Sequence, residues 1–387
     1  MAFATIDVTK GISGVTPVAN GGTALSSGFK NGVDPRENAQ PLIINGDMAV
    51  AQRGTSSSGK TSAGYYACDR WNFAISSGGT WTISQDTDVP SGEGFSTSTK
   101  YDCTTAQGSL GSAAYIQHRQ SIEGQNLQLL KKGTSNAEKI TISFWVKATK
   151  TGTNILELFD NTNNRQVSKA YTVSSSDTWE KKVVNFPADT SGALANNNSG
   201  ALNVQFYLGA GSNLSSGTLS ETWTAYTNAD RAVGQVNHAD STSNNFYITG
   251  VQLEVGEFSS TTLPPFQFED TGDNLLRCKR YYQTTIMPDT SDYWGQGYYY
   301  TNSEFTCKMP IQEMRAQPTL DQVSGSNYFT VYSNNSGDAI NDFSLDASSS
   351  RRCVSFTDTG ESSGTAGFGG GLYKSNASAR FAFDAEL

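Results

Sequence analysis

The sequence predicts an all-β protein: a jelly-roll β-sandwich, then a smaller C-terminal β-sandwich, with a short extended segment at the N-terminus. The first reason is composition, since only 16% of the 387 residues are charged while 17 Tyr and 19 Phe are present. The second is that Gly, Ser, Thr and Asn, which favour turns and strand faces over helix interiors, make up much of the remainder. The third is a series of short alternating runs separated by turn residues.

Residues 1–40 form the first region, rich in Gly, Ala and Thr and poor in large apolar side chains. Such a composition does not build a core by itself. We expect this region either to be disordered or to be ordered by neighbouring chains or a docking partner. Its start lacks a basic-then-apolar leader, so synthesis in the cytoplasm without secretion is expected.

Residues 41–270 form the second region, where strands and turns recur over about 200 residues as in a jelly-roll sandwich. A short helix is expected at Ser121 to Lys132, where Leu127, Leu129 and Leu130 cluster. The alternating segments predicted as strands are Ile140 to Lys147, Trp179 to Phe186, Leu202 to Leu208 and Phe246 to Leu253.

Residues 271–387 form the third region, predicted to be the smaller sandwich. Asn274 to Gln283 is expected to be a short helix that leads into a strand, and Arg380 to Leu387 alternates as a final strand. Between the two sandwiches, Leu263-Pro264-Pro265-Phe266 predicts a rigid linker.

The net charge of the chain restricts the classes of ligand that are expected. The formal net charge is −9, which argues against nucleic acid and against anionic lipid as main ligands. No apolar run approaches the ~20 residues that a membrane helix requires, so no membrane insertion is expected. A weakly charged, acidic surface is compatible with uncharged ligands such as sugars.

The cysteines are odd in number and widely separated, which matches neither zinc-site nor redox-motif spacing. We interpret them as small buried residues of a chain made in a reducing cytosol, without disulfides. They are Cys68, Cys103, Cys278, Cys307 and Cys353.

Two glycine-rich segments resemble nucleotide loops. Gly54 to Thr61 matches the phosphate-loop pattern letter for letter, but the residues after it form a poor helix, so we interpret it as a hairpin loop. Gly367 to Gly371 lacks a strand-helix-strand context and is interpreted as a flexible turn or as tight packing at a symmetry axis.

No catalytic residue, metal site or cofactor is assigned. His118 and His238 stand alone, outside any metal-ligand spacing or nucleophile elbow. Carboxylates that a glycosidase would need as a pair cannot be sorted by sequence, because the decisive spacing is spatial. The candidates are Asp69, Glu157, Glu254 and Asp292.

One acidic segment, Asp86 to Glu93, has oxygen ligands at close spacing but a misplaced glycine for a calcium loop. An acidic surface turn is the favoured interpretation, and a structural calcium stays open.

Aromatic side chains are the most useful functional signal. Trp294, Tyr298, Tyr299 and Tyr300 cluster beside Gly295 and Gly297. Sugar rings stack on exposed aromatic faces while neighbouring polar groups orient them. These four residues are therefore the predicted glycan contacts, although alternate members of such a cluster often fill a core.

Several segments together resemble tail-fibre and receptor-binding proteins of tailed bacteriophages. The first is the Pro-Val-Ala-Asn-Gly-Gly-Thr element at Pro17 to Thr23. Others are similar to a phage structural domain with a carbohydrate-binding-module-like jelly roll, or to the C-terminal module that follows it. These are Leu42 to Met48, Ala51 to Gly54, Asp69 to Trp71, Ser143 to Lys147, Val251 to Gly256, Arg277 to Gln283, Glu313 to Thr319 and Asp384 to Leu387.

This resemblance implies a virion appendage, usually a homotrimer, that binds host cell-surface polysaccharide without catalysis. It implies no catalytic residues. Residues 1–40 then become a virion-attachment or trimerisation segment, with Val15, Pro17, Val18 and Asn20 as docking candidates on other virion proteins. About 40 residues is short for a fibre that docks on a tail, so tail and capsid attachment both stay open. The alternatives are a purely structural decoration or adaptor protein and a fibre-borne glycan hydrolase.

Overall fold

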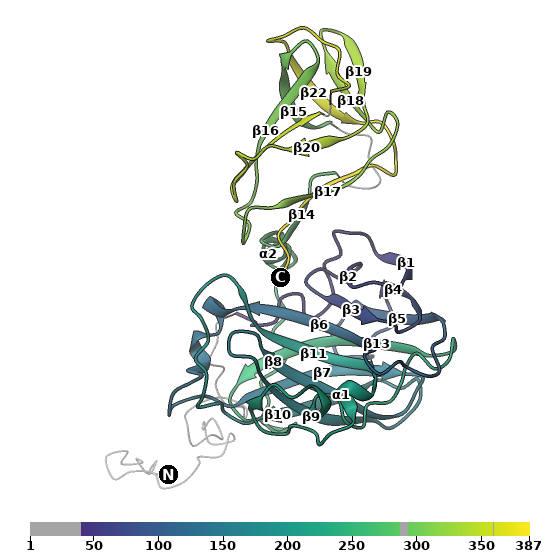
Figure 1. Ribbon diagram of the computed structural model, residues 1–387, viewed down its shortest axis with the longest axis vertical. Helices are drawn as coiled ribbons and strands as arrows, with labels where there is room; N and C mark the ends of the chain where they lie inside the picture. The colour runs from purple at the N-terminus through teal and green to yellow at the C-terminus, as the bar shows by residue number, and fades with distance from the viewer. Residues whose placement is uncertain (1–39, 287–292, 359) are drawn as a thin grey trace, which may run out of the picture.

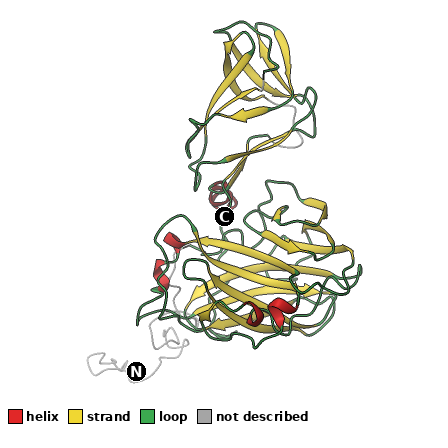
Figure 2. Cartoon of the chain, viewed as in Figure 1, coloured by secondary structure: helices red, strands yellow, loops and turns green. Residues whose placement is uncertain are grey.

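The computed structural model describes residues 40–286, 293–358 and 360–387 (Figure 1). Strands dominate the described chain, and the helices are short (Figure 2). Within these residues the strands form four antiparallel sheets, named A to D here. Sheets A and B make an N-terminal module, and sheets C and D make a C-terminal module. The predicted all-β class with two sandwiches is confirmed.

Sheet A and sheet B face each other as the two layers of the jelly roll. Sheet A has the order β1 (Ser56–Lys60), β4 (Thr80–Asp86), β5 (Ser98–Thr105), β13 (Asn245–Val255), β7 (Ile140–Ala148) and β10 (Glu180–Phe186). Sheet B has the order β12 (Thr224–Ala225), β9 (Arg165–Val173), β8 (Gly152–Asp160), β11 (Gly200–Ala210), β6 (Tyr115–Glu123), β3 (Asn72–Ser76) and β2 (Gly64–Tyr65).

Aromatic rings join the two layers. Phe144 of β7 meets Phe206 of β11 with ring centroids 4.9 Å apart, and Phe73 of β3 meets Trp81 of β4 at 6.0 Å. Both contacts lie in one continuous buried cluster that takes residues from both sheets. Burial of apolar surface at about 25 cal/mol per Å² makes this cluster the main source of stability in the module.

The C-terminal module repeats the two-layer plan on a smaller scale. Trp294 packs against Phe381 of β23 at 4.6 Å and stacks on Phe356 of β21 at 5.7 Å, so the core lies between sheets C and D. Sheet C has the order β14 (Tyr282–Thr284), β23 (Arg380–Asp384) and β17 (Thr319–Val323). Sheet D has the order β19 (Ser336–Ile340), β18 (Phe329–Ser333), β22 (Gly369–Lys374), β15 (Tyr293–Thr301), β16 (Glu304–Pro310), β21 (Cys353–Asp358) and β20 (Phe343–Leu345).

Helix α2 (Thr271–Lys279) and the chain end lie between the modules (Figure 1). The side chain of Asp270 caps the helix by accepting a hydrogen bond from the Gly272 amide at 2.8 Å. The predicted helix followed by a strand is confirmed, because β14 begins three residues after α2 ends. The other helices within the described residues are α1 (Ser212–Ser215) and the 3₁₀ turns η3 (Gly124–Asn126), η4 (Gln128–Leu130) and η5 (Asn228–Asp230).

Buried ion pairs connect the two modules at this interface, which is called the joint here. Arg70 is nearly inaccessible; it pairs with Glu386, donates to the Ser121 carbonyl at 2.7 Å and stacks on the Tyr281 ring at 3.4 Å. Arg280 binds Glu123 through two bonds of 2.8 Å. Such pairs fix geometry, since separating them would leave charges buried without partners.

Three local predictions are modified by the structure. Ser121 to Lys132 is the end of β6 followed by the short 3₁₀ helices η3 and η4, so the predicted short helix is confirmed in part; Leu127 and Leu130 point into the core. Leu263 to Phe266 does not stand free between modules: Gln252 donates to the Pro264 carbonyl at 3.0 Å. Cys353 is exposed, whereas the other four cysteines are buried as predicted.

The predicted strands at 140, 179, 202, 246 and 380 all form, as β7, β10, β11, β13 and β23. In the part of the chain that the structure describes, no helix is long and apolar enough to cross a membrane.

Candidate functional site

A cleft of about 320 Å³ lies on the outward face of sheet B. Strands β6, β8 and β11 form its floor, while α1 and the loop that contains η5 form one wall; Figure 1 shows α1 in front of this sheet. Its lining residues are Tyr115, Gln117, Arg119, Phe159, Asn161, Asn164, Asn203, Gln205, Leu214, Tyr226 and Arg231.

The floor is made of amide side chains. Gln117 of β6 and Asn203 and Gln205 of β11 are 3%, 8% and 2% exposed. They alternate with core residues such as Val204 and Phe206, because successive strand residues point to opposite faces. Amides both donate and accept hydrogen bonds, so this floor can pair with a hydroxyl in either role.

A buried ion pair stiffens one side of the cleft. The Arg231 guanidinium donates two bonds of 2.8 Å to Glu157 and a longer one, 3.4 Å, to Gln205. Tyr207 donates to the same Glu157 carboxylate at 2.9 Å. Burial alone would lower the pKa of Arg231, but the Glu157 carboxylate beside it raises that pKa, so Arg231 stays charged. Its planar fork holds Glu157 in one orientation.

Aromatic rings line the same side. Phe159 of β8 and Tyr226 meet edge to face at 5.8 Å, and the Arg231 guanidinium lies 5.2 Å and 5.5 Å from their centroids. The Tyr226 hydroxyl donates to Asn228 of η5 at 2.9 Å. Together these contacts hold two ring faces beside the amide floor, a combination that suits a ring with apolar faces and hydroxyl edges.

Arg119 completes the cleft. Within the described residues, no carboxylate lies at ion-pair distance from its guanidinium, which is half-buried at the cleft wall. Guanidinium offers five N–H donors and no acceptor. The site therefore holds hydrogen-bond donors, acceptors and apolar ring faces, and its one fully buried carboxylate, Glu157, is already bound.

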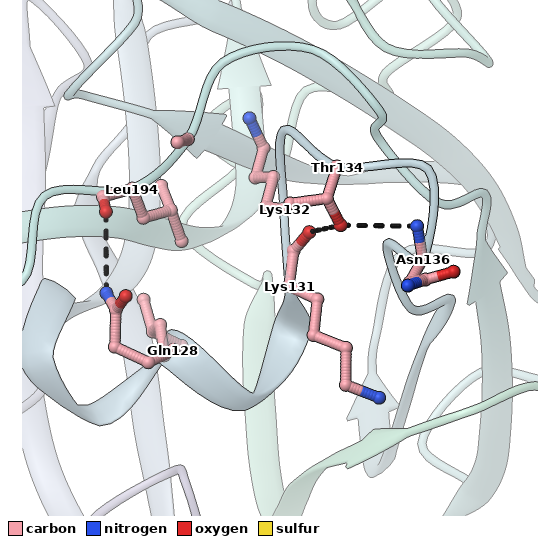
Figure 3. A pocket seen from close by; sticks show the side chains of 8 residues that line it. Gln128, Lys131, Lys132, Thr134, Asn136 and Leu194 are labelled. Carbon is pink, nitrogen blue, oxygen red and sulfur yellow. Dashed lines mark hydrogen bonds between the residues drawn. The ribbon is translucent and has the colours of Figure 1, made fainter.

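A larger hollow of about 440 Å³ lies beside η4, and Figure 3 shows the side chains around it. No aromatic ring lines it. Lys132 directs its ammonium to Asp160 and Asp189, at 2.5 Å and 2.8 Å, so its charge is already neutralised. The Thr134 hydroxyl donates to the Lys131 carbonyl at 2.7 Å and accepts from the Asn136 amide. The sheet B cleft is the better candidate, since its polar groups occur with ring faces.

The four predicted aromatic contacts divide into two pairs. Trp294 and Tyr299 are core residues: Trp294 packs between the sheets, and Tyr299 is buried against Phe305 at 5.3 Å. Tyr298 and Tyr300 are exposed on β15. Strand alternation separates Tyr299 from Tyr298 and Tyr300, and the register shift between Tyr293 and Gly295 turns Trp294 to the core face. Glycan contact by Tyr298 and Tyr300 stays a prediction.

The glycosidase candidates lie in separate places. Glu157 is fully buried beside the cleft and paired with Arg231, Glu254 is buried in β13 of the opposite sheet, and Asp292 lies outside the described residues. Asp69 is buried in the joint, where Gln52 donates to it at 3.0 Å through its backbone amide. Burial raises the pKa of Asp69 to about 6, while Arg53 opposes the shift.

Both histidines are completely buried. His118 stacks on Trp71 at 4.2 Å and meets the Tyr101 hydroxyl at 2.5 Å. His238 meets Asn154 at 2.7 Å. Burial lowers the pKa of each to about 3, so both are neutral at pH 7.

The loop-like motifs have structural roles. Gly54 to Thr61 is not a hairpin loop: its centre is β1, an edge strand paired with β4, because Ser and Thr side chains tolerate an exposed strand. In the Asp86 to Glu93 turn, Asp88 pairs with Lys147 and accepts from Trp179 at 2.9 Å. Among the described residues, no group of three metal-ligating side chains is close enough to hold an ion.

The docking candidates Val15, Pro17, Val18 and Asn20 lie outside the described residues. The sequence reasoning missed the amide floor of the cleft. Its signal was present in Leu202 to Leu208, where Asn203 and Gln205 alternate with apolar residues. A polar face that carries amides in place of charges is the feature that would have distinguished this strand.

No protein-family model matches the chain, and no curated protein matches it. Solved structures do. The enzymatically active domain of bacteriophage CBA120 tailspike protein 4 is similar at 14% identity and a TM-score of 0.28, over 56% of this chain and 21% of that one. This chain therefore spans about a fifth of that tailspike structure.

Two shorter structures are similar over nearly their whole length. A putative sugar binding protein from Bacteroides thetaiotaomicron has 14% identity and a TM-score of 0.29, over 56% of this chain and 100% of that one. TmCBM61, solved with β-1,4-galactotriose, has 9% identity and a TM-score of 0.29, over 56% and 98%. All three scores are low, so the jelly-roll assignment rests on the sheet order and core contacts described above.

Proposed function

We propose that the chain is a non-catalytic, glycan-binding subunit of a virion appendage that attaches the virus to polysaccharide on the host cell surface. The observation that carries the binding role is the sheet B cleft, where nearly buried amides meet the rings of Phe159 and Tyr226. Neutral sugars need such a combination of directional hydrogen bonds and apolar faces.

The virion context rests on the ordered sequence resemblance to phage fibre proteins. In that context the subunit acts as a homotrimer, mounted on the tail or the capsid through residues 1–40, with Val15, Pro17, Val18 and Asn20 as docking contacts. Three copies turn weak sugar contacts into avidity, because the second and third contacts are intramolecular.

The non-catalytic assignment is supported by the state of Glu157. Its two oxygens accept from Arg231 and from Tyr207, and the side chain is fully buried, so its carboxylate is not open to a ligand in the cleft. A hydrolase would release reducing ends from a polysaccharide that the chain binds. We expect binding without such release.

The test measures full-length chain on an array of neutral and acidic polysaccharides. Tyr226→Ala removes a ring from the cleft and should weaken binding about tenfold, which corresponds to about 1.4 kcal/mol. Phe268→Ala, which removes an exposed ring elsewhere on the same module, is the matched control and should bind as the parent does.

Equal losses in both variants, or no binding by the parent chain, would overturn the cleft and favour a purely structural decoration protein. Light scattering on the same sample tests the assembly. A trimer agrees with the fibre assignment, and a stable monomer contradicts it.

A further inference from the structure

The outward face of sheet D carries a group of tyrosines that the core does not use. Tyr293 of β15, Tyr332 of β18 and Tyr373 of β22 come from three neighbouring strands. Tyr293 lies opposite Tyr373 in the β15–β22 register, and Tyr332 lies opposite Gly371 in the β18–β22 register. These three side chains are called the tyrosine platform here.

The rings of the platform hold one another in place. Centroid distances are 5.4 Å between Tyr293 and Tyr373, 5.5 Å between Tyr332 and Tyr373, and 6.0 Å between Tyr293 and Tyr332. All three contacts are edge to face, the geometry that aromatic quadrupoles favour. Yet Tyr293 is 63% exposed and Tyr332 is 44% exposed. Rings that are exposed to solvent but already held in one orientation lose little conformational entropy when a ligand binds.

Glycines open the sheet beside the rings. A Cβ at Gly371 would lie 2.9 Å from the Tyr293 ring, so the glycine lets that ring lie close to the strand. A Cβ at Gly369 would meet nothing closer than a carbonyl oxygen at 3.7 Å, so the space there is open. Tyr298, also exposed, lies opposite Gly369. In the strip over Gly369 and Gly371, the Tyr293 ring therefore lies against Gly371, while the space over Gly369 is open and has Tyr298 beside it.

The core does not explain this open strip. Gly370, between the two, faces inward, where a Cβ would lie 2.5 Å from the Val331 side chain. Gly370 is thus required by packing, whereas Gly369 is not. A side chain at Gly369 would cover the strip without disturbing the interior.

Most of the polar groups named around the platform are uncharged. Thr330 and Ser375 share a hydroxyl hydrogen bond of 2.5 Å, and Ser333 donates to the Gly369 carbonyl at 2.7 Å. The exposed Gln296 lies opposite Gly371. An exposed Lys308 on β16 adds one positive charge beyond Gln296. Rings with hydroxyls and an amide at their border match a neutral sugar better than an ionic partner.

We propose that the tyrosine platform and the strip over Gly369 and Gly371 form a second glycan-binding surface, which takes a neutral oligosaccharide chain by stacking its ring faces on Tyr293 and Tyr332. This extends the proposed glycan-binding function to the C-terminal module. It differs from the cleft in shape: an open, flat surface accepts the middle of a long chain as readily as its end.

The two surfaces belong to one body. The buried pairs of the joint, Arg70 with Glu386 and Arg280 with Glu123, fix the modules to each other. A polysaccharide long enough to reach both surfaces binds the second one at high effective concentration. Long neutral polysaccharide should therefore bind more tightly than a short oligosaccharide of the same sugar.

The test uses full-length chain in which Tyr226→Ala has already weakened the cleft, so that failure of the cleft and failure of the platform are separable. The probe is an array of neutral hexose polysaccharides and oligosaccharides. Adding Tyr293→Ala and Tyr332→Ala together should reduce the residual binding tenfold or more. Adding Val323→Ala, which trims an exposed apolar side chain of sheet C in the same module, should leave it unchanged.

A second variant guards against misfolding. Gly369→Gln fills the strip, keeps every tyrosine and should also reduce the residual binding, while its thermal unfolding midpoint stays that of the parent. Unchanged residual binding in both platform variants overturns the proposal, as does equal loss in Val323→Ala. Sedimentation velocity adds one more outcome: an assembly that dissociates in the double tyrosine variant would make the platform a contact between subunits and overturn the glycan assignment.

Discussion

The two modules solve the same packing problem but present their outward faces differently. In the N-terminal module, α1 and the η5 loop rise over sheet B and leave a cleft whose amide floor is nearly buried. In the C-terminal module, sheet D presents tyrosine rings on an open face. The loop beside sheet B gives the cleft a wall and polar groups of fixed orientation. The glycines within β22 of sheet D leave an open, flat surface instead. Ligand selectivity is therefore expected from the first module and contact area from the second.

The interiors differ as well. Both histidines of the sequence lie in the N-terminal module, buried among aromatic rings, and residues 271–387 contain none. The C-terminal core is a group of phenylalanines around Trp294. Titratable groups in a core make the free energy of unfolding depend on pH, whereas a core of apolar side chains adds no pH dependence.

The largest expected effect comes from the joint. Arg70→Ala should lower the free energy of unfolding by about 3–5 kcal/mol, because Glu386 then stays buried without its closest partner. Arg53, 3.3 Å from Glu386, offsets part of the loss. Urea unfolding followed by tryptophan fluorescence measures it. Arg352→Ala, which breaks an exposed pair with Glu313, is the control and should change little. Equal effects would mean that the modules are joined only loosely.

Acidification should lower the stability of the N-terminal module more than that of the C-terminal module. The pKa of His118 and His238 is about 3 in the folded chain and about 6.5 when unfolded, so between these values the unfolded state binds more protons. The stability that depends on these two neutral histidines is fully present above their pKa in the unfolded state. It is lost as pH falls from that value towards their pKa in the folded state. From pH 6.5 to pH 5 the loss is about 2 kcal/mol per histidine. Asp69, whose pKa is raised to about 6, acts in the opposite sense over this range.

Calorimetry at pH 7 and pH 5 checks this expectation. The midpoint of the N-terminal module should fall at pH 5, and His238→Gln, which can keep the hydrogen bond to Asn154, should make the fall smaller. A midpoint that is independent of pH, or that falls by the same amount in His238→Gln, would contradict the assignment to the histidines.

The smallest expected effect is a difference in stability between alanine substitutions at two glycines of sheet D. Gly297→Ala would place a Cβ 2.1 Å from the Thr306 carbonyl oxygen, so the strands must move apart, at a cost of about 1–3 kcal/mol. Gly369→Ala meets open space and should leave stability nearly unchanged. Thermal unfolding of the pair measures the difference. Similar losses in both would show that Gly369 is needed for the fold, and its role in the platform would then need no ligand.

The sequence by itself determined the all-β class, the two sandwiches and most of the principal strands. Alternation of apolar and polar residues is a local property with a period of two, so β7, β11 and β13 could be recognised without knowledge of their neighbours. At Ser121 to Lys132 the leucines indicated a short helix, but not that the segment begins as the end of β6, because that strand is defined by its pairing with β3 and β11.

Only the tertiary structure decided which aromatic residues are available. Tyr299 is buried and Trp294 is half-buried against the core, while Tyr298 and Tyr300 are exposed, since register shifts and intervening glycines in β15 set which face each ring takes. The cleft likewise joins strands β6, β8 and β11, which are distant in sequence but adjacent in sheet B. Strand order depends on the pairing of distant segments, and no local pattern encodes it. The sequence therefore supplied the side chains of both surfaces, and the fold decided which of them meet.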